Sequence, residues 1–239
     1  MRTSIFKLAA VSVAMSALAV SAPAFAQDEA AEEASGPITL TGGVALVSDY
    51  RFRGVSLSDK DFAVQPYLTV KHESGFYVGA WASNLSENTG DDLEVDLYAG
   101  FSGGDAVTYD IGATYYLYPG VSSFNYVEFT GKLGTTVGPA TIGGQLSYVP
   151  SQDNTGNTDN IYVATNAAFA IPGTPLNLTG SVGYEDGFFA NDKVDWSVGV
   201  SGSSNGFTLG VAYVDTNRRS TFAFKDSKAG VVFSLAYGF

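Results

Sequence analysis

The chain ends Val231-Val232-Phe233-Ser234-Leu235-Ala236-Tyr237-Gly238-Phe239, and this stretch decides the fold. Large apolar residues take every second position, and mostly small residues lie between them. Side chains alternate between the two faces of a β-strand, so one face here is continuously apolar and ends in two aromatic rings. A transmembrane barrel pairs such an edge and turns the apolar face to lipid. The alternative is a buried terminal strand of a soluble β-sandwich.

The same strand has the features of an insertion signal. A terminal phenylalanine, an aromatic residue two positions earlier and alternating hydrophobic residues before them resemble the C-terminal signal of outer-membrane proteins. The residues that carry this signal are Phe233, Leu235, Tyr237 and Phe239. We therefore expect the barrel-assembly machinery to be a partner of this strand. We also expect the strand to close the barrel by pairing with the first strand near residues 40–47.

The N-terminus predicts export. Arg2 and Lys7 form a basic region, residues 8–20 are an apolar run, and Ala24-Phe25-Ala26 is a small-x-small cleavage site. This pattern is typical of a signal peptide over residues 1–26. A retained membrane helix is the alternative, but the run is shorter than the ~20 residues that a span needs.

Composition limits the remaining domains and the partners. Residues 27–37 (QDEAAEEASGP) are acidic and predict a periplasmic linker, which leaves residues 38–239 for the barrel. The formal net charge is −12, which makes nucleic acid an unsuitable partner. The chain has no cysteine, which excludes a disulfide scaffold and a thiolate metal site.

From residue 38 onward the chain consists of short alternating segments separated by turn residues. We predict an all-β fold, a twelve-stranded antiparallel transmembrane β-barrel with up-and-down topology, because bacterial barrels have an even number of strands. The expected strands lie near residues 38–48, 62–71, 75–85, 93–101, 107–117, 127–137, 140–149, 160–171, 176–185, 193–201, 207–215 and 230–239.

The connections between these segments alternate between long and short. Short turns on one side and longer loops on the other are typical of outer-membrane barrels. This asymmetry predicts a protein of the bacterial outer membrane, embedded in its lipid, with both termini and the short turns in the periplasm. Aromatic residues near the ends of the strands predict interfacial girdles. At the outer side these residues are Tyr50, Tyr118, Phe124, Tyr148, Tyr184, Phe188 and Phe189, and at the periplasmic side they are Phe76, Phe101 and Phe239.

Several motifs resemble one family. VSDYRFRGVS at residues 47–56 is similar to the opening motif of the TorF family of porins, and GFYVGAWASN at residues 75–84 is similar to its second motif. LEVDLYAG, YYLYPG and NYVE, between residues 93 and 128, continue the resemblance in order. The resemblance extends over roughly residues 40–239. It implies an outer-membrane β-barrel of Gram-negative bacteria, and it implies no catalytic residue.

Charged side chains on the inward faces are the candidate functional residues, because an Arg or Lys facing lipid at the midplane costs ~2–4 kcal/mol. One interpretation is a net-acidic channel with a local arginine cluster near its outer mouth. The other is a plugged interior in which Arg51 and Arg53 neutralise Glu94, Asp96 or Glu128. The predicted pore-lining residues are Asp49, Arg51, Arg53, Glu94, Asp96, Asp110, Glu128, Lys132 and Asp195.

Enzymatic function finds little support. The single histidine, His72, lies beside a predicted turn, and one histidine without cysteine makes neither a credible catalytic base nor a transition-metal site. We expect no enzyme activity, metal or cofactor. The predicted function is a porin for ion transport and passive diffusion of small hydrophilic solutes. The alternative is a closed structural or surface-interaction barrel that does not conduct.

Overall fold

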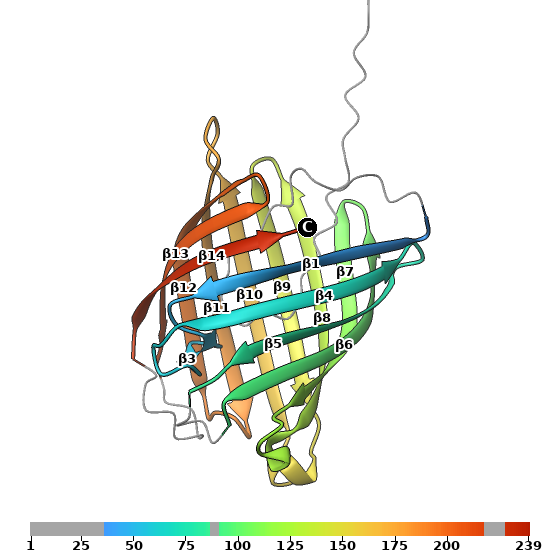
Figure 1. The fold of residues 1–239 in the computed structure, drawn as a ribbon, viewed down its shortest axis with the longest axis vertical. Coiled ribbons are helices and arrows are strands. Elements are labelled where there is room, and N and C mark those ends of the chain that lie inside the picture. Colours follow the sequence, from blue (N-terminus) through green and yellow to red (C-terminus); the bar gives the residue numbers. More distant parts are fainter. Residues whose placement is uncertain (1–35, 87–90, 218–227) are drawn as a thin grey trace, which may run out of the picture.

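The computed structural model describes residues 36–86, 91–217 and 228–239. Within them, twelve antiparallel strands hydrogen-bond in a closed barrel (Figure 1), which confirms the predicted fold class. The predicted signal peptide and residues 27–35 of the predicted linker lie outside the described residues. The barrel strands are β1 (Ile38–Val47), β4 (Ala63–His72), β5 (Phe76–Asn84), β6 (Leu93–Gly104), β7 (Val107–Leu117), β8 (Tyr126–Val137), β9 (Ala140–Val149), β10 (Asn160–Ala170), β11 (Leu176–Gly187), β12 (Lys193–Ser204), β13 (Phe207–Thr216) and β14 (Gly230–Gly238).

The alternation of residue types decides which face of each strand turns outward. In β8, Phe129 and Leu133 are 53% and 61% exposed on the outer face, whereas Glu128 and Lys132 are buried on the inner face. Neighbouring strands show the same division, because successive side chains point to opposite sides of a sheet. The barrel therefore has an apolar outer surface and a polar interior.

The closing seam lies between β1 and β14, as the C-terminal stretch predicts. Residues 43–47 pair with residues 234–238, and Leu46 lies opposite Leu235. Gly42 and Phe239 extend the seam by exchanging two backbone hydrogen bonds of 3.0 and 2.9 Å. On the inner side, a Cβ atom added to Gly43 would lie 2.8 Å from the Tyr67 ring, so this ring lies directly over the seam.

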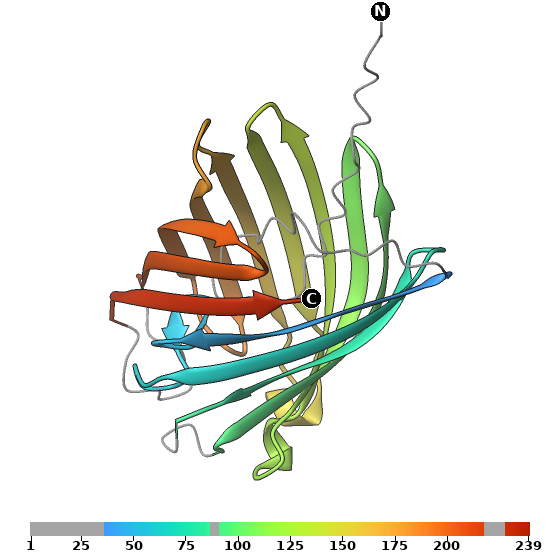
Figure 2. The same cartoon turned by 45° about the horizontal axis from the view of Figure 1, so that its top comes forward.

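The connections divide as expected between the two ends of the barrel. Tight turns join the strands at one end, and longer loops join them at the other end (Figures 1 and 2). Two of the longer loops contain short 3₁₀ helices, η2 (Ser122–Phe124) and η3 (Asp153–Thr155). The described part of the chain contains no helix that is long and apolar enough to cross a membrane.

The first long loop differs from its prediction. It contains a second, two-stranded sheet, β2 (Arg51–Phe52) and β3 (Val55–Ser56), beside the wall of the barrel (Figure 1). Between residues 49 and 58 all side chains are buried except Phe52, which is half-buried. Residues 49–58, called the inserted hairpin below, thus fold into the lumen. Asp49, Arg51 and Arg53 do not continue the inner face of β1, because the chain turns inward there.

The predicted outer girdle is correct only in part. Tyr148 and Tyr184 are 42% and 41% exposed on the outer face of the barrel. Tyr50 instead belongs to the inserted hairpin and is buried at 2% exposure against Trp81. Position near a strand end does not by itself specify the direction of a side chain.

Candidate functional site

A two-residue turn forms the tip of the inserted hairpin. Arg53 and Gly54 both have positive φ, 48° and 85°, which is the geometry of a type I′ hairpin turn. A Cβ atom added to Gly54 would lie 2.8 Å from the Cβ of Asp195 in β12 and 3.0 Å from that of Thr216 in β13. The tip therefore touches the barrel wall, and a glycine is required at this contact.

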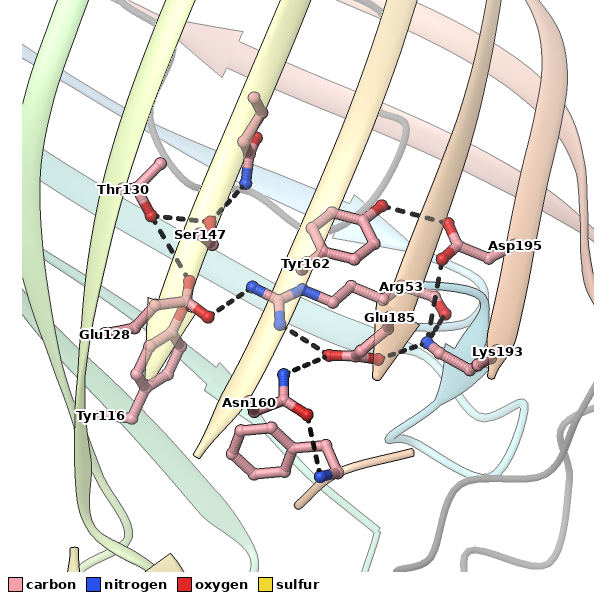
Figure 3. Close-up of polar contacts among 12 residues, drawn as sticks. Arg53, Tyr116, Glu128, Thr130, Ser147, Asn160, Tyr162, Glu185, Lys193 and Asp195 are labelled. Carbon is pink, nitrogen blue, oxygen red and sulfur yellow. Dashed lines mark hydrogen bonds and ion pairs between the residues drawn. The ribbon is translucent and has the colours of Figure 1, made fainter. Parts of the chain in front are cut away.

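Arg53 connects the hairpin tip to two separate strands of the barrel (Figure 3). Its Nη2 donates to Glu128 Oε2 in β8 at 2.5 Å, and its Nη1 donates to Glu185 Oε1 in β11 at 2.7 Å. The guanidinium carbon also lies 4.2 Å from the centre of the Tyr162 ring in β10. All three charged groups are buried. One cation thus holds the hairpin against the wall from β8 to β11.

Lys193 holds the hairpin through its main chain. Its Nζ donates to the Arg53 carbonyl oxygen at 2.5 Å and lies 2.7 Å from Glu185 Oε2. Asn160 Nδ2 donates to Glu185 Oε1 at 3.1 Å, and Asn160 Oδ1 accepts the Phe189 N–H at 3.0 Å (Figure 3). The same network thus connects the hairpin to the loop between β11 and β12.

Arg51 orders the hairpin from within. Its Nε donates to Asp49 Oδ2 at 2.6 Å, and its Nη1 donates to the carbonyl oxygens of Gly54 at 3.2 Å and Lys228 at 2.8 Å. Ser56 Oγ donates to the other oxygen of Asp49 at 2.6 Å. The Arg51–Asp49 pair is thus internal to the hairpin, and it does not neutralise a carboxylate of the barrel wall.

Two carboxylates on the opposite wall have no cationic partner in the part of the chain that the structure describes. Glu94 in β6 accepts the hydroxyls of Tyr50 at 2.9 Å and Tyr118 at 3.2 Å, and neither Glu94 nor Asp96 forms an ion pair with any described residue. Asp96 Oδ1 and the indole N–H of Trp81, opposite each other in paired strands, are buried without a hydrogen-bond partner in the described chain. Buried polar groups normally have partners.

A pocket lies between the hairpin and the longer loops. It is open to solvent, and the space of about 780 Å³ within it includes part of that open solvent. Rings form much of its wall, and the Tyr126 ring is stacked on Tyr116 with 4.4 Å between centroids. The lining residues are Phe52, Val55, Leu57, Leu85, Glu94, Tyr118, Phe124, Tyr126, Asn154, Glu185, Phe188, Phe189 and Lys193.

The remaining predicted lumen residues, Asp110, Lys132 and Asp195, lie on the inner wall of the barrel. Asp110 faces Lys132 across the β7–β8 register and accepts the Tyr77 hydroxyl at 2.9 Å. Asp195, beside the tip, accepts the Tyr162 hydroxyl at 3.2 Å. The structure therefore divides the nine predicted residues among the inserted hairpin, the wall around its tip, the unpaired acidic wall and the Asp110–Lys132 pair.

Sequence reasoning missed Glu185, Lys193, Asn160, Tyr162 and Trp81. A signal existed for Glu185 and Lys193, because Tyr184 and Val194 alternate with them and face outward, and because the two charges are paired in the β11–β12 register. No local signal identifies Arg53 as their partner, since Glu185 lies 132 positions away in the sequence.

Two features bear on enzyme and metal chemistry. His72 Nδ1 lies 2.7 Å from Ser74 Oγ and also accepts the Ser74 N–H at 3.1 Å, which is a local contact within a turn. In the ranges that the structure describes, no group of three or more His, Cys, Asp or Glu side chains is placed to hold a metal ion.

Comparison with solved structures identifies the architecture. The fold is similar to KdgM porin, with a TM-score of 0.57 at 7% identity, over 83% of this chain and 98% of that one. It is equally similar to NanC porin, with a TM-score of 0.57 at 9% identity, over 84% and 99% of the two chains. At such identities the likeness is one of fold. No curated protein matches the sequence.

The sequence itself matches one family model. The match covers residues 31–236, and the family is described as "Bacterial protein of unknown function (Gcw_chp)". The chain belongs to this family.

Proposed function

We propose that this member of the Gcw_chp family is an outer-membrane channel for passive diffusion of small hydrophilic solutes, in which the inserted hairpin forms the constriction. The proposed orientation in the membrane places both termini and the tight turns in the periplasm and the hairpin at the outer mouth. The apolar terminal strand engages the barrel-assembly machinery. The resemblance to the TorF porins and the fold shared with KdgM and NanC porins support this proposal.

The observation that carries the proposal is the polar inner wall of a closed barrel. Hydrogen-bonding side chains face one another inside it, as in the Ser181–Ser197 pair at 2.7 Å and the Lys71–Ser102 pair at 2.7 Å. A barrel filled solely for stability needs no such surface, because apolar side chains fill an interior at lower desolvation cost. Twelve strands also lie between eight-stranded barrels, which side chains fill, and the wide sixteen-stranded porins.

The acidic wall favours cations over anions. Glu94 and Asp96 are not neutralised by ion pairs within the described chain, whereas the two arginines of the hairpin already have carboxylate partners. We therefore expect cation preference. A small-anion site at Arg51 and Arg53 is the opposite prediction, and reversal potentials of Arg51→Ala and Arg53→Ala channels decide between the two.

One observation favours a second function, a closed structural or surface-interaction barrel. The hairpin is held by buried ion pairs to β8 and β11, as expected for a sealed lumen. Planar-bilayer recording of the purified protein separates the candidates. The channel predicts discrete conductance steps that increase when residues 49–58 are replaced by a short Gly-Ser linker. Absence of conductance in both the native and the hairpin-replaced barrel contradicts the channel and supports the closed barrel.

A further inference from the structure

The pocket above the hairpin combines an apolar wall with a carboxylate. Its apolar lining includes Phe52 and Leu57 of the inserted hairpin and, on the β5–β8 side, Leu85, Tyr118 and Tyr126. Glu94 lies in the same wall, and its two oxygens accept the Tyr50 and Tyr118 hydroxyls. Among the described residues, the carboxylate is thus fixed in place by neutral donors and not by a cation.

The charge balance around the pocket is uneven. Arg53 and Lys193 form ion pairs with carboxylates of the β8–β12 side, and Arg51 forms one with Asp49 of its own hairpin. Glu94 and Asp96, two positions apart on the inner face of β6, have no counterpart within the described chain. A buried carboxylate is costly unless it is paired, and Asp96 Oδ1 has no hydrogen-bond partner among the described residues. This side of the mouth therefore has a deficit of positive charge.

The lumen already shows how it accommodates an organic cation. The Arg53 guanidinium lies over the rings of Phe52 at 4.7 Å and Tyr162 at 4.2 Å while its nitrogens bind carboxylates. Aromatic faces attract cations, and they do so best for weakly hydrated organic cations such as quaternary ammonium groups. The Glu94 side of the pocket has the same two components, aromatic rings and a carboxylate, but not the cation.

We propose that the pocket between the inserted hairpin and the β5–β8 wall binds small organic cations of the ammonium class, with Glu94 as counter-ion and Tyr118 as aromatic platform. Asp96 strengthens the negative potential from below. Organic ammonium compounds would then be a solute class of the channel, and this role in transport rests on the proposed function. Binding itself requires only the folded barrel.

The chain provides its own reporter for this site. It contains two tryptophans, of which Trp196 faces outward and Trp81 is buried 5.4 Å from the Tyr50 ring that contacts Glu94. In a Trp196→Phe background, the folded full-length barrel in detergent micelles is titrated with choline at constant ionic strength. We expect a saturable change in Trp81 fluorescence and a matching heat by calorimetry. The neutral isostere 3,3-dimethylbutanol should give neither.

Matched variants connect the signal to the site. Glu94→Gln preserves the shape and keeps an acceptor oxygen for one of the two tyrosine hydroxyls, and it should weaken choline binding by at least about tenfold because a nearby opposite charge is lost. Tyr118→Leu should weaken binding by about 2- to 30-fold, whereas Tyr118→Phe, which keeps the ring, should not. Glu73→Gln, in an exposed turn at the opposite end, controls for net charge.

Three results overturn the proposal: no saturable response to choline in either measurement, an equal response to the neutral isostere, or unchanged affinity in Glu94→Gln. The isostere result would define an apolar pocket instead. Failure of the site and failure of the channel are distinguishable. Choline binding without bilayer conductance refutes the channel alone, and conductance without choline binding refutes the site alone.

Discussion

Replacement of Arg53 by alanine should release the inserted hairpin. The change leaves Glu128 and Glu185, each 2% exposed, without their shared cation and removes the stacking on Tyr162. Removal of one partner from a buried ion pair costs roughly 3–5 kcal/mol. Water at the mouth can hydrate the freed carboxylates, which leaves about 2–3 kcal/mol against the inserted state and raises the population of the released hairpin about 30- to 150-fold.

Thiol labelling measures this population directly. The chain has no cysteine, so Val55→Cys places a single thiol on the hairpin at a position that is 4% exposed. The rate of reaction with a water-soluble maleimide then reports how often the hairpin leaves the lumen. We expect the rate to increase in Arg53→Ala by the factor given above. The labelling rate of Arg53→Lys should lie between those of the parent and Arg53→Ala, because an ammonium group cannot bridge both carboxylates with the guanidinium geometry.

Lys71→Ala is the matched control, because it removes an inner-wall cation that binds Ser102 and not the hairpin. Its labelling rate should equal that of the parent. If Arg53→Ala labels within about threefold of the parent while the barrel remains folded, the ion pairs do not hold the hairpin. The hairpin would then be retained by its apolar packing and its bonds to the barrel main chain.

Three further predictions concern the hairpin tip, a loop tether and the outer face of the barrel. Gly54→Ala should also accelerate labelling of the Val55→Cys thiol, because the new Cβ meets Asp195 at 2.8 Å at a φ of 85°, whereas Gly131→Ala, which has open space, should not. Burial raises the pKa of Asp91, but four backbone N–H donors lower it by more, so the net pKa lies below its usual range. Two of these donors are the N–H groups of Gly120 and Val121 in the next loop. The tether between these loops should therefore be intact above about pH 4 and be lost as the pH falls through the lowered pKa. The amide resonance of Gly120 should report this loss, and Asp91→Asn should abolish the titration. Leu133→Lys, on the outer face of β8, should reduce the free energy of unfolding in lipid vesicles by roughly 2–4 kcal/mol, and Asn166→Lys on the inner wall of β10 should reduce it less. An equal loss in both lysine variants would show that the outer face does not contact lipid.

The strands could be predicted from the sequence because their physical cause is local. In β8, the alternation of Glu128, Phe129, Thr130, Gly131 and Lys132 specifies both the strand and its inward face. The seam was predictable for a different reason, because an apolar terminal strand in a closed barrel can pair only with the first one. Period-two patterning therefore predicted the number of barrel strands and the face that each strand turns inward.

The inserted hairpin was not predictable by the same reasoning. Residues 49–61 combine charged and polar residues with four apolar or aromatic ones, and such a loop is compatible with solvent as well as with a polar lumen. The Arg53-Gly54 pair between Phe52 and Val55 is a weak signal for a two-residue turn, but it says nothing about where the turn points. The direction depends on Glu128 and Glu185, which are brought together only when β8 and β11 occupy their places in the closed barrel.

The Tyr67 ring over the β1–β14 seam has a consequence for assembly. The glycines beneath it, Gly43 and Gly238, leave just enough room for the ring, since added Cβ atoms would lie 2.8 and 3.3 Å from it. A slip of the terminal strand by two residues, which keeps the apolar face outward, would place Ala236 or an unpaired chain end beneath the ring. The observed alignment of the first and last strands is therefore the one that places two glycines beneath Tyr67, and a misaligned ending would crowd this side chain at the seam.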